Sequence, residues 1–380
     1  MSLTRFLIFL LIFLTLNGYL YIRGRQALPD GAVMHLIYTI IFLMASLSVF
    51  IAVFAGNKLP VWLAFVFEEV GGYWVILFIF LIAAALLGDI LRISDHLFRV
   101  FPAWVTSNYP LAKLGYFCTI LVLLGTMSLI GFTRFSHPGI VELDIKAGSH
   151  SDKSDAITIL AVSDMHLGNV IRKSRLAKWV DLINLQKPDI ILLAGDIFDH
   201  SYRAVESQQM DKELARLYAP YGVYAIPGNH DYYTGIEKTL GYLKRSGIHI
   251  LRDTVVTVDN RIVLIGRDDL TNKNRKTLAS LMTGLNNNLP KVVLDHQPHS
   301  FGESVENHVD LHLSGHTHNG QIFPYNKIVS RIYDLGYGYR KTGNTHFYVS
   351  SGLGLWGAPI RLGTQSEIVR ILLSLPEKKE

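Results

Sequence analysis

The sequence predicts an α/β domain preceded by about four transmembrane helices. Three observations support this fold class. Residues 1–132 are apolar and contain only 7 of the 36 Lys and Arg residues and 5 of the 31 Asp and Glu residues. The rest of the chain alternates short apolar runs with helical patterns, which is typical of layered α/β folds. Polar side chains of metal-binding type follow five of those apolar runs.

Four apolar stretches of about 20 residues are each long enough to cross the hydrocarbon core of a bilayer as a helix. They are Leu3–Ile22, Val33–Phe54, Tyr73–Ile93 and Leu111–Phe132. The first alone could be a signal peptide, but three more follow it and no small-residue cleavage site stands out. We therefore expect a multi-pass cell-membrane protein. Residues 1–135 form its transmembrane region, and residues 136–154 form a linker and a first strand.

Charged residues around these spans carry information about topology. Asp89 and Arg92 are three residues apart, so we expect them to form an ion pair on one helix face. Lys and Arg residues near the spans divide five to four between the two sides, and this small bias favours a C-terminal domain outside the cytoplasm. Cys118 is the single cysteine, which excludes disulfides within the chain. No basic stripe accompanies the net charge of +5, so a nucleic-acid partner is not predicted.

Residues 155–380 are expected to form the C-terminal domain. Its predicted strands include Ile157–Val162, Ile190–Ala194, Val223–Ile226, Val292–Leu294 and Val309–Leu313. Helical spacing of apolar residues predicts helices at Ser174–Gln186, Glu206–Tyr218 and Gly235–Ser246. The stretch from Ile322 to the end is rich in Gly, Tyr and β-branched residues. We expect it to form a second sheet packed against the first.

Seven side chains with oxygen or imidazole ligand atoms follow the ends of these five strands. They are Asp164, His166, Asp196, Asn229, His296, His316 and His318. Ligands of open α/β sheets collect at the carboxyl ends of strands. Asp164 and His166, two residues apart, are expected to share one face of an extended strand, as are His316 and His318. Seven ligands are too many for one tetrahedral ion. They predict a two-ion site that hydrolyses a phosphate ester.

These residues fall into five blocks that resemble the signature of the calcineurin-like metallophosphoesterase family. The blocks are Asp164-Met-His166, Gly195-Asp196-x-x-Asp199, Gly228-Asn229-His230-Asp231, His296 and Gly315-His316-x-His318. The resemblance covers about residues 155–370 and implies a two-sheet metallophosphoesterase sandwich flanked by helices. The glycine-rich tail from Ser351 to Gly363 resembles a membrane-associated branch that includes UDP-diacylglucosamine hydrolases and other phosphodiesterases.

The resemblance also implies roles for individual residues. Asp196 would bridge two ions, of which Asp164, His166 and His318 would hold one and Asn229, His296 and His316 the other. His230 directly follows a ligand, so it is the candidate general acid or charge stabiliser for the leaving oxygen. Asp199 resembles the family residue that orients this histidine. Lone histidines such as His200 are expected at the surface or in supporting positions.

The donor set suits Mn²⁺, with Zn²⁺ or Fe as alternatives, better than Ca²⁺. We expect a membrane-anchored hydrolase of a phosphodiester or pyrophosphate bond in a lipid-linked substrate, with membrane lipid as a partner. The same chemistry on a soluble nucleotide or phosphodiester is the alternative. A catalytically silent scaffold of this fold, which belongs to another functional class, would have lost ligands, and none is lost.

The sequence leaves two points open in the C-terminal segment. Tyr337, Tyr339, Leu355 and Trp356 fit either a membrane interface or a β-sheet core. Arg361 fits either a phosphate contact or a structural salt bridge. A fragment that begins at about residue 150 is expected to hydrolyse a small activated diester without the membrane part.

Overall fold

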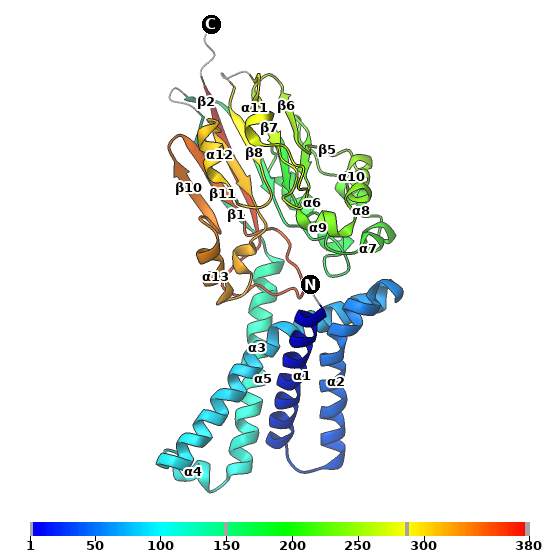
Figure 1. Cartoon of the computed structure of the whole chain (residues 1–380), viewed down its shortest axis with the longest axis vertical. Helices are drawn as coiled ribbons and strands as arrows, with labels where there is room; N and C mark the ends of the chain where they lie inside the picture. The colour runs from blue at the N-terminus through cyan, green and yellow to red at the C-terminus, as the bar shows by residue number, and fades with distance from the viewer. Residues whose placement is uncertain (1–2, 148–150, 286–288, 377–380) are drawn as a thin grey trace. The chain divides into compact units, whose positions relative to one another are not determined.

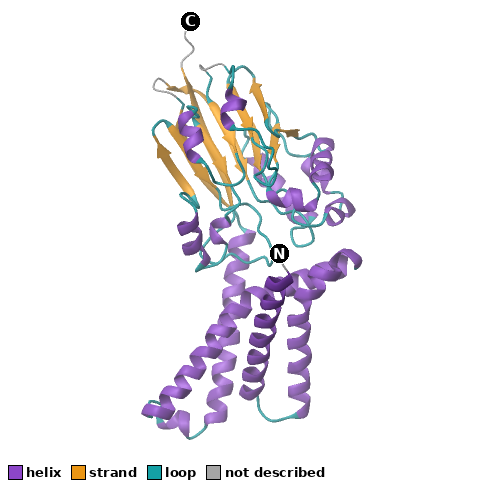
Figure 2. Cartoon of the chain, in the orientation of Figure 1, coloured by secondary structure: helices purple, strands orange, loops and turns teal. Residues whose placement is uncertain are grey.

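The computed structural model describes residues 3–147, 151–285 and 289–376. It divides the chain into two compact units, Met1–Leu129 and Ile130–Glu380, which we call the membrane unit and the sheet unit. The membrane unit is helical, and every described strand belongs to the sheet unit (Figures 1 and 2). Residues 148–150 of the expected linker lie outside the described residues.

Four long helices dominate the membrane unit. They are α1 (Leu3–Ala27), α2 (Ala32–Ala55), α3 (Val61–Phe98) and α5 (Tyr109–Ser136), whose last residues belong to the sheet unit. The short helices η1 (Gly56–Lys58) and α4 (Ala103–Thr106) lie between them. Each long helix is apolar enough to cross a bilayer. The prediction of four membrane-capable helices is therefore confirmed.

Small and aromatic residues pack the helices of this unit. Phe13, Phe42 and Phe78 form a buried cluster from α1, α2 and α3. At Gly71 of α3 a Cβ atom would lie 3.0 Å from the backbone nitrogen of Val49 on α2. Only glycine permits this approach without displacement, which is typical of helix packing in membranes.

The carboxylate of Asp89 on α3 accepts ion pairs and a hydrogen bond from neighbouring side chains. It pairs with Arg92 at 3.5 Å, as the sequence predicts, and with Arg23 of α1 at 2.6 Å. The hydroxyl of Tyr19 donates a hydrogen bond to the same carboxylate at 2.8 Å. A carboxylate in an apolar helix is stable only when it is paired in this way.

The sheet unit contains two six-stranded sheets, with strand orders β1-β12-β2-β3-β4-β5 and β10-β11-β9-β8-β7-β6. The strands of the first are β1 (Gly139–Lys146), β2 (Ser151–Val162), β3 (Ile190–Ala194), β4 (Val223–Ile226), β5 (His249–Ile250) and β12 (Glu367–Pro376). Those of the second are β6 (Thr254–Val258), β7 (Ile262–Gly266), β8 (Lys291–Leu294), β9 (Leu311–Ser314), β10 (Gly338–Thr342) and β11 (Thr345–Val349).

Short helices flank the two sheets (Figure 2). They are α6 (Lys173–Leu185), α7 (Tyr202–Ser207), α8 (Met210–Leu214), α9 (Asn229–Thr234), α10 (Ile236–Arg245), α11 (Leu278–Met282), α12 (Phe301–Glu306), η2 (His318–Gly320) and α13 (Tyr325–Ile332). Alternate residues of β2 enter different cores: Ile159 lies between the sheets, and Leu160 lies in the core that contains Trp179 of α6. The expected two-sheet sandwich flanked by helices is confirmed.

Two details of the expected layout are wrong. The second sheet does not consist of the stretch after Ile322, because it begins at β6 and contains β8 and β9, while β12 returns to the first sheet. The helix expected over Glu206–Tyr218 is two helices, because Gln209 between them has a left-handed backbone with φ of 51°. No local sequence pattern predicts that β12 joins the first sheet or that the helix breaks at Gln209.

The end of α5 is part of the sheet unit. Phe135 is fully buried in its core against Trp179, and Arg175 of α6 lies over the Phe135 ring at 4.3 Å. β1 then pairs with β12 over eight residues, from Gly139 to Lys146. The fragment from about residue 150, whose activity on a small diester stays a prediction, excludes these residues. It would lack an edge strand and a core side chain, whereas a fragment from Ile130 keeps both.

Candidate metal centre

The seven ligand-type residues of the sequence lie at one edge of the two sheets. They follow β2, β3, β4, β8 and β9, where the sequence predicts strand ends; Asn229 begins α9 and His318 begins η2, and the other five lie in loops. β2, β3 and β4 are parallel neighbours in one sheet, and β8 and β9 are parallel neighbours in the other. Carboxyl ends of parallel strands meet at a common edge, so two sheets contribute to one site.

The backbone at this edge of the sheets is left-handed at several of the ligand-type residues. Five of the seven residues have positive φ: 54° at Asp164, 48° at His166, 51° at Asp196, 72° at His316 and 49° at His318. The expectation that the two spaced pairs share the face of an extended strand is therefore wrong. The strands end first, and left-handed residues turn the side chains together. Strained backbone of this kind collects at functional sites.

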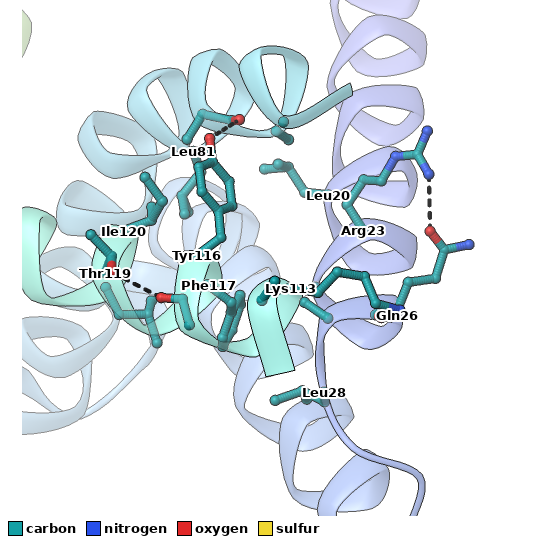
Figure 3. A pocket seen from close by; sticks show the side chains of 18 of the residues that line it. Leu20, Arg23, Gln26, Leu28, Leu81, Lys113, Tyr116, Phe117, Thr119 and Ile120 are labelled. Carbon is teal, nitrogen blue, oxygen red and sulfur yellow. Dashed lines mark hydrogen bonds between the residues drawn. The ribbon is translucent and has the colours of Figure 1, made fainter. Parts of the chain in front are cut away.

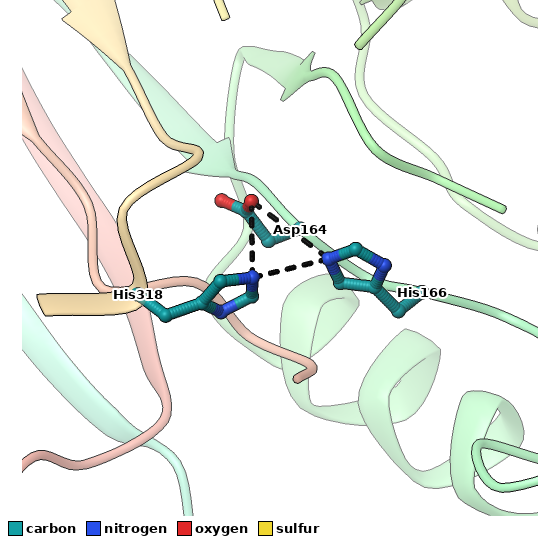
Figure 4. Close-up of side chains that lie close together, drawn as sticks. All are labelled: Asp164, His166 and His318. Atoms are coloured by element: carbon teal, nitrogen blue, oxygen red, sulfur yellow. Dashed lines mark hydrogen bonds and ion pairs between the residues drawn. The ribbon is translucent and has the colours of Figure 1, made fainter. Parts of the chain in front are cut away.

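One group of side chains consists of Asp164, His166 and His318 (Figure 4). The Nε2 atoms of the two histidines are 3.1 Å apart. Nε2 of His318 lies 3.5 Å from Oδ1 of Asp164, and Nε2 of His166 lies 4.0 Å from it. Three ligand atoms that converge within 4.8 Å of one another have the spacing of a metal site.

A second group consists of Asp196, His296 and His316. Nδ1 of His296 is 2.8 Å from the carbonyl oxygen of Ala194, which makes Nδ1 the N–H donor and leaves Nε2 free to bind a metal ion. The side-chain oxygen of Asn229 is buried and has no hydrogen-bond partner among the described residues. A buried oxygen without a partner is costly. A bound cation would satisfy it, so this donor set fits a metal ion.

Asp196 lies between the two groups. Its Oδ2 atom is 3.1 Å from Nε2 of His296 in one group and 3.8 Å from Nε2 of His166 in the other. Its Oδ1 atom accepts a hydrogen bond from the backbone N–H of His230 at 2.8 Å. Burial raises the pKa of this carboxyl, but His296 and His166 hold it below its usual range. The side chain is therefore a charged acceptor shared by both groups.

The histidines of the site differ in pKa because their charged neighbours differ. Burial and the neighbouring His296 lower the pKa of His316 to about 4, and burial and His166 lower the pKa of His318 well below its usual value. Both are neutral at pH 7, the form that binds metal ions. For His296, burial also lowers the pKa, but the carboxylates of Asp196 and Asp164 outweigh it and raise the pKa well above its usual value. A metal ion there would displace a proton.

His230 lies beside His166 of the first group, with ring centroids 4.5 Å apart, and forms a further potential ligand group with His166 and Asp199. Nδ1 of His230 is 3.1 Å from Oδ1 of Asp199, which is also 3.5 Å from Nδ1 of His166. The ring of His200 stacks on His230 with a centroid distance of 4.7 Å. Burial lowers the pKa of His230, but the hydrogen bond with Asp199 and the charge of Asp196 raise it above its usual value. The sequence alone does not show that His200 approaches this close.

Asp231 fixes the loops around Asp196. Its carboxylate accepts hydrogen bonds from the backbone N–H groups of Gly228 and Phe198 at 2.9 and 3.0 Å. It is fully buried and belongs to none of the ligand groups found among the described residues. Its role is to connect the loop after β3 with the loop after β4.

Asp269 is a residue that the sequence analysis missed. It follows β7, is buried, and accepts hydrogen bonds from Nε2 of Gln297 at 2.9 and 3.1 Å. Its charge is one of the influences that raise the pKa of His296. The available signal was the acidic pair Asp268-Asp269, which follows the apolar run Ile262–Ile265 after Gly266 and Arg267. It has the same strand-end position as the predicted ligands.

Backbone carbonyl groups, and no carboxylate among the described residues, bind the guanidinium of Arg361. Arg361 is fully buried, and its guanidinium donates hydrogen bonds to the carbonyl oxygens of Ser351, Gly352 and Gly354. Burial lowers its pKa to about 10. The loop that it holds donates from Gly354 N to the carbonyl oxygen of Asp164 at 2.9 Å. In place of the structural salt bridge that the sequence left open, Arg361 forms this backbone clamp behind a ligand, and the phosphate contact stays a prediction.

Glycines precede the ligands because the site has no room for a Cβ atom. A Cβ at Gly228 would collide with the carboxylate of Asp196, and one at Gly315 would collide with Oδ2 of Asp164. The φ of Gly228 is −116°, a value that any residue adopts. The need for glycine at this position is therefore steric and not conformational.

Comparison with known proteins identifies relatives of the chain. The model of the calcineurin-like phosphoesterase family matches residues 157–320. An uncharacterized metallophosphoesterase of Helicobacter pylori is 35% identical over 274 residues, which cover 70% of this chain and 71% of that protein. A transmembrane protein with metallophosphoesterase domain of Danio rerio is 27% identical over 331 residues, which cover 83% of this chain and 74% of that protein.

We predict that Gly228→Ala reduces the metal affinity of the purified protein by about 10- to 100-fold, the range found for partners that orient ligands. The added methyl displaces the Asp196 carboxylate without straining the backbone. Metal titration with calorimetric detection measures the effect. Gly241→Ala in α10 is the matched control, because a Cβ there meets open space. Equal affinities of the two variants would show that the Asp196 carboxylate is not confined as described.

Proposed function

Because the chain belongs to the calcineurin-like metallophosphoesterase family and is a metal-dependent phosphoesterase, we propose that it uses two divalent ions to cleave a phosphodiester or pyrophosphate bond in a lipid-linked substrate. The observation that carries the two-ion proposal is the position of Asp196 between two ligand groups. The exposed apolar surface described below supports the lipid-linked substrate.

The proposed ligand assignment follows the two groups. One ion would be held by Asp164, His166 and His318 and the other by Asn229, His296 and His316, with Asp196 shared. Carboxylate, amide and imidazole donors suit Mn²⁺, with Zn²⁺ or Fe as alternatives. Bound ions of this kind activate water and neutralise phosphoryl oxygens.

His230 is the proposed proton donor to the leaving oxygen. It is 15% exposed, adjoins Asn229 in the chain and is oriented by Asp199 at 3.1 Å. The raised pKa keeps the ring protonated to a higher pH than an isolated imidazole. A protonated donor beside the metal groups can transfer its proton when the ester bond breaks.

An exposed apolar surface on the sheet unit supports a substrate in the bilayer. Helix α13 presents Ile328 and Ile332, four residues apart, with 47% and 65% of their surfaces exposed. Phe323 before the helix and Trp356 in the loop behind the metal site are also more than half exposed. We call these four residues the interfacial surface. Apolar side chains next to exposed Lys and Arg are typical of helices that lie in a membrane interface.

Backbone hydrogen bonds connect this surface to the end of the fourth membrane-capable helix. The N–H of Arg361 donates to the carbonyl oxygen of Gly131 in α5 at 3.1 Å. The N–H of Phe323 donates to the carbonyl oxygen of Leu362 at 2.7 Å. The interfacial surface is therefore tied to the last residues of α5, which belong to the sheet unit. By contrast, Leu355 is buried in the core, so only part of the aromatic C-terminal segment is available to a membrane.

The topology proposed for this enzyme places the sheet unit outside the cytoplasm. Arg23, Arg25, Arg92, Arg99 and Lys113 lie in or next to the connections after α1 and α3. This side has one more cation than the other, and cytoplasmic loops carry the excess. The connection after α1 and the sheet unit would then lie on opposite sides of the membrane.

We predict that the purified enzyme contains two metal ions per chain and that Asn229→Ala retains about one. The amide oxygen belongs to only one of the proposed ion sites, so its loss leaves the other intact. Elemental analysis after gel filtration measures the stoichiometry. Asn307→Ala, at the end of α12, is the control and should retain two. One ion in the wild type together with full activity of Asn229→Ala would refute the two-ion proposal.

We predict that His230→Gln keeps its metal content but lowers kcat on a soluble diester by about 10²- to 10⁴-fold. In Asp199→Asn the neighbouring charge that raises the pKa of His230 is lost. Because activity is lost as pH rises through that pKa, the alkaline limb of kcat/KM should move to lower pH. Metal loss in His230→Gln would make the residue a ligand. An unchanged pH profile in a metal-loaded Asp199→Asn enzyme would contradict the role of His230 as the acid.

We predict that Ile328→Ser combined with Ile332→Ser spares hydrolysis of a soluble diester but lowers activity on a lipid pyrophosphate in vesicles by about tenfold or more. Removing two apolar side chains from an interface costs roughly 1–3 kcal/mol of membrane affinity. Leu185→Ser is the control, because Leu185 is exposed on α6, outside the interfacial surface. Equal losses on both substrates would favour the soluble-substrate alternative.

We predict that a membrane-impermeant maleimide labels Lys178→Cys, but not Asp30→Cys, in intact cells after Cys118→Ser removes the single native thiol. Lys178 is exposed on α6 of the sheet unit, and Asp30 is exposed in the connection between α1 and α2. Labelling after lysis provides the reference for each position. The reverse pattern would place the sheet unit in the cytoplasm.

A further inference from the structure

The membrane unit contains a large cavity that the proposed reaction does not use. It has a volume of about 1030 Å³ and is lined by residues of α1, α2, α3, α4 and α5 (Figure 3). Pockets that bury a drug-sized ligand are about 300–1,000 Å³. The cavity is therefore large enough for an organic molecule and far larger than an inorganic ion requires.

The lining of the cavity is amphipathic. Its apolar part includes Phe42, Trp74, Leu81 and Ile120, which lie in the middle of their helices. The indole N–H of Trp74 is buried and has no hydrogen-bond partner among the described residues. An apolar cavity does not hold water stably. Alkyl chains fit such a wall, and an ester carbonyl would satisfy the indole N–H.

The other part of the lining is cationic. Its charged residues are Arg23, Arg92, Lys113 and Asp89. Arg23 lies near the end of α1 and Lys113 near the start of α5, whereas Asp89 and Arg92 lie nine and six residues before the end of α3. Arg23 pairs with Asp89 at 2.6 Å, and Nζ of Lys113 donates to the carbonyl oxygen of Gln26 at 2.9 Å. One carboxylate among three cations leaves an excess of two positive charges. An anionic headgroup complements this excess.

We infer that the cavity holds a resident anionic phospholipid of the bilayer, with its acyl chains along the apolar wall and its phosphate beside Arg92 and Lys113. The exposed indole of Trp104 on α4 also lines the cavity, and such side chains are typical of the headgroup level of a membrane. This site is separate from the metal-ligand groups, and binding there requires no hydrolysis.

The inference is tested with the full chain in detergent. Titration with phosphatidylglycerol should change the fluorescence of the tryptophans, two of which line the cavity, whereas phosphatidylcholine should not. Arg92→Gln combined with Lys113→Gln should weaken phosphatidylglycerol binding by about 30-fold, from roughly fivefold for each cation near an anionic headgroup. Ala45→Phe should also weaken phosphatidylglycerol binding, because the larger side chain narrows the apolar part of the cavity. Arg25→Gln removes an exposed charge outside the lining and should have no effect.

Metal content and gel-filtration behaviour show that each variant is folded. Equal binding of the two lipids, or equal effects of the double variant and Arg25→Gln, would identify the bound lipid as unspecific solvation and overturn the inference. Consumption of the bound lipid on addition of Mn²⁺ would identify it as substrate, which also overturns a resident role. Failure of the proposed lipid hydrolysis would leave the binding result unaffected, because the two are measured separately.

Discussion

A buried carboxylate shared by two sets of neighbours organises the site. Asp196 is almost completely inaccessible, and an isolated charge at such a depth is strongly unfavourable. Its stability depends on His296 and His166 and on the backbone N–H of His230. The surrounding loops satisfy this requirement: glycines permit the close approach, and Asp231 holds two of the loops by their N–H groups. Bound cations would provide the remaining compensation.

The same edge is hydrogen-bonded to the last residues of α5, which belong to the sheet unit. Arg361 clamps the loop whose Gly354 N–H supports Asp164, and its own N–H bonds to Gly131 of α5. Phe135, one turn further along α5, lies in the core of the sheet unit. A change in the position of the end of α5 would therefore be transmitted to a proposed ligand through few covalent and hydrogen-bonded steps. The last residues of α5 thus supply core and loop contacts within the sheet unit.

Two features of the chain combine apolar and cationic side chains and support the two proposals about lipids. The interfacial surface exposes apolar side chains that would be unfavourable in water but stable among lipid headgroups and upper acyl chains. The cavity of the membrane unit combines an apolar wall with an excess of cations. They belong to different units and are built from different residues. Each is therefore open to testing without the other.

The sequence by itself determined the kind of elements and the residue types of the site. Apolar length identified the membrane helices, and the position of Asp196 or His296 after an apolar run identified a strand end, because these signals are local. Tertiary structure decided which sheet each strand joins, so that β8 and β9 meet β2 across two sheets. It also decided the left-handed turns at Asp164 and His316, the approach of His200 to His230, and the clamp by Arg361. These depend on contacts between residues distant in sequence, whose energies no local pattern contains.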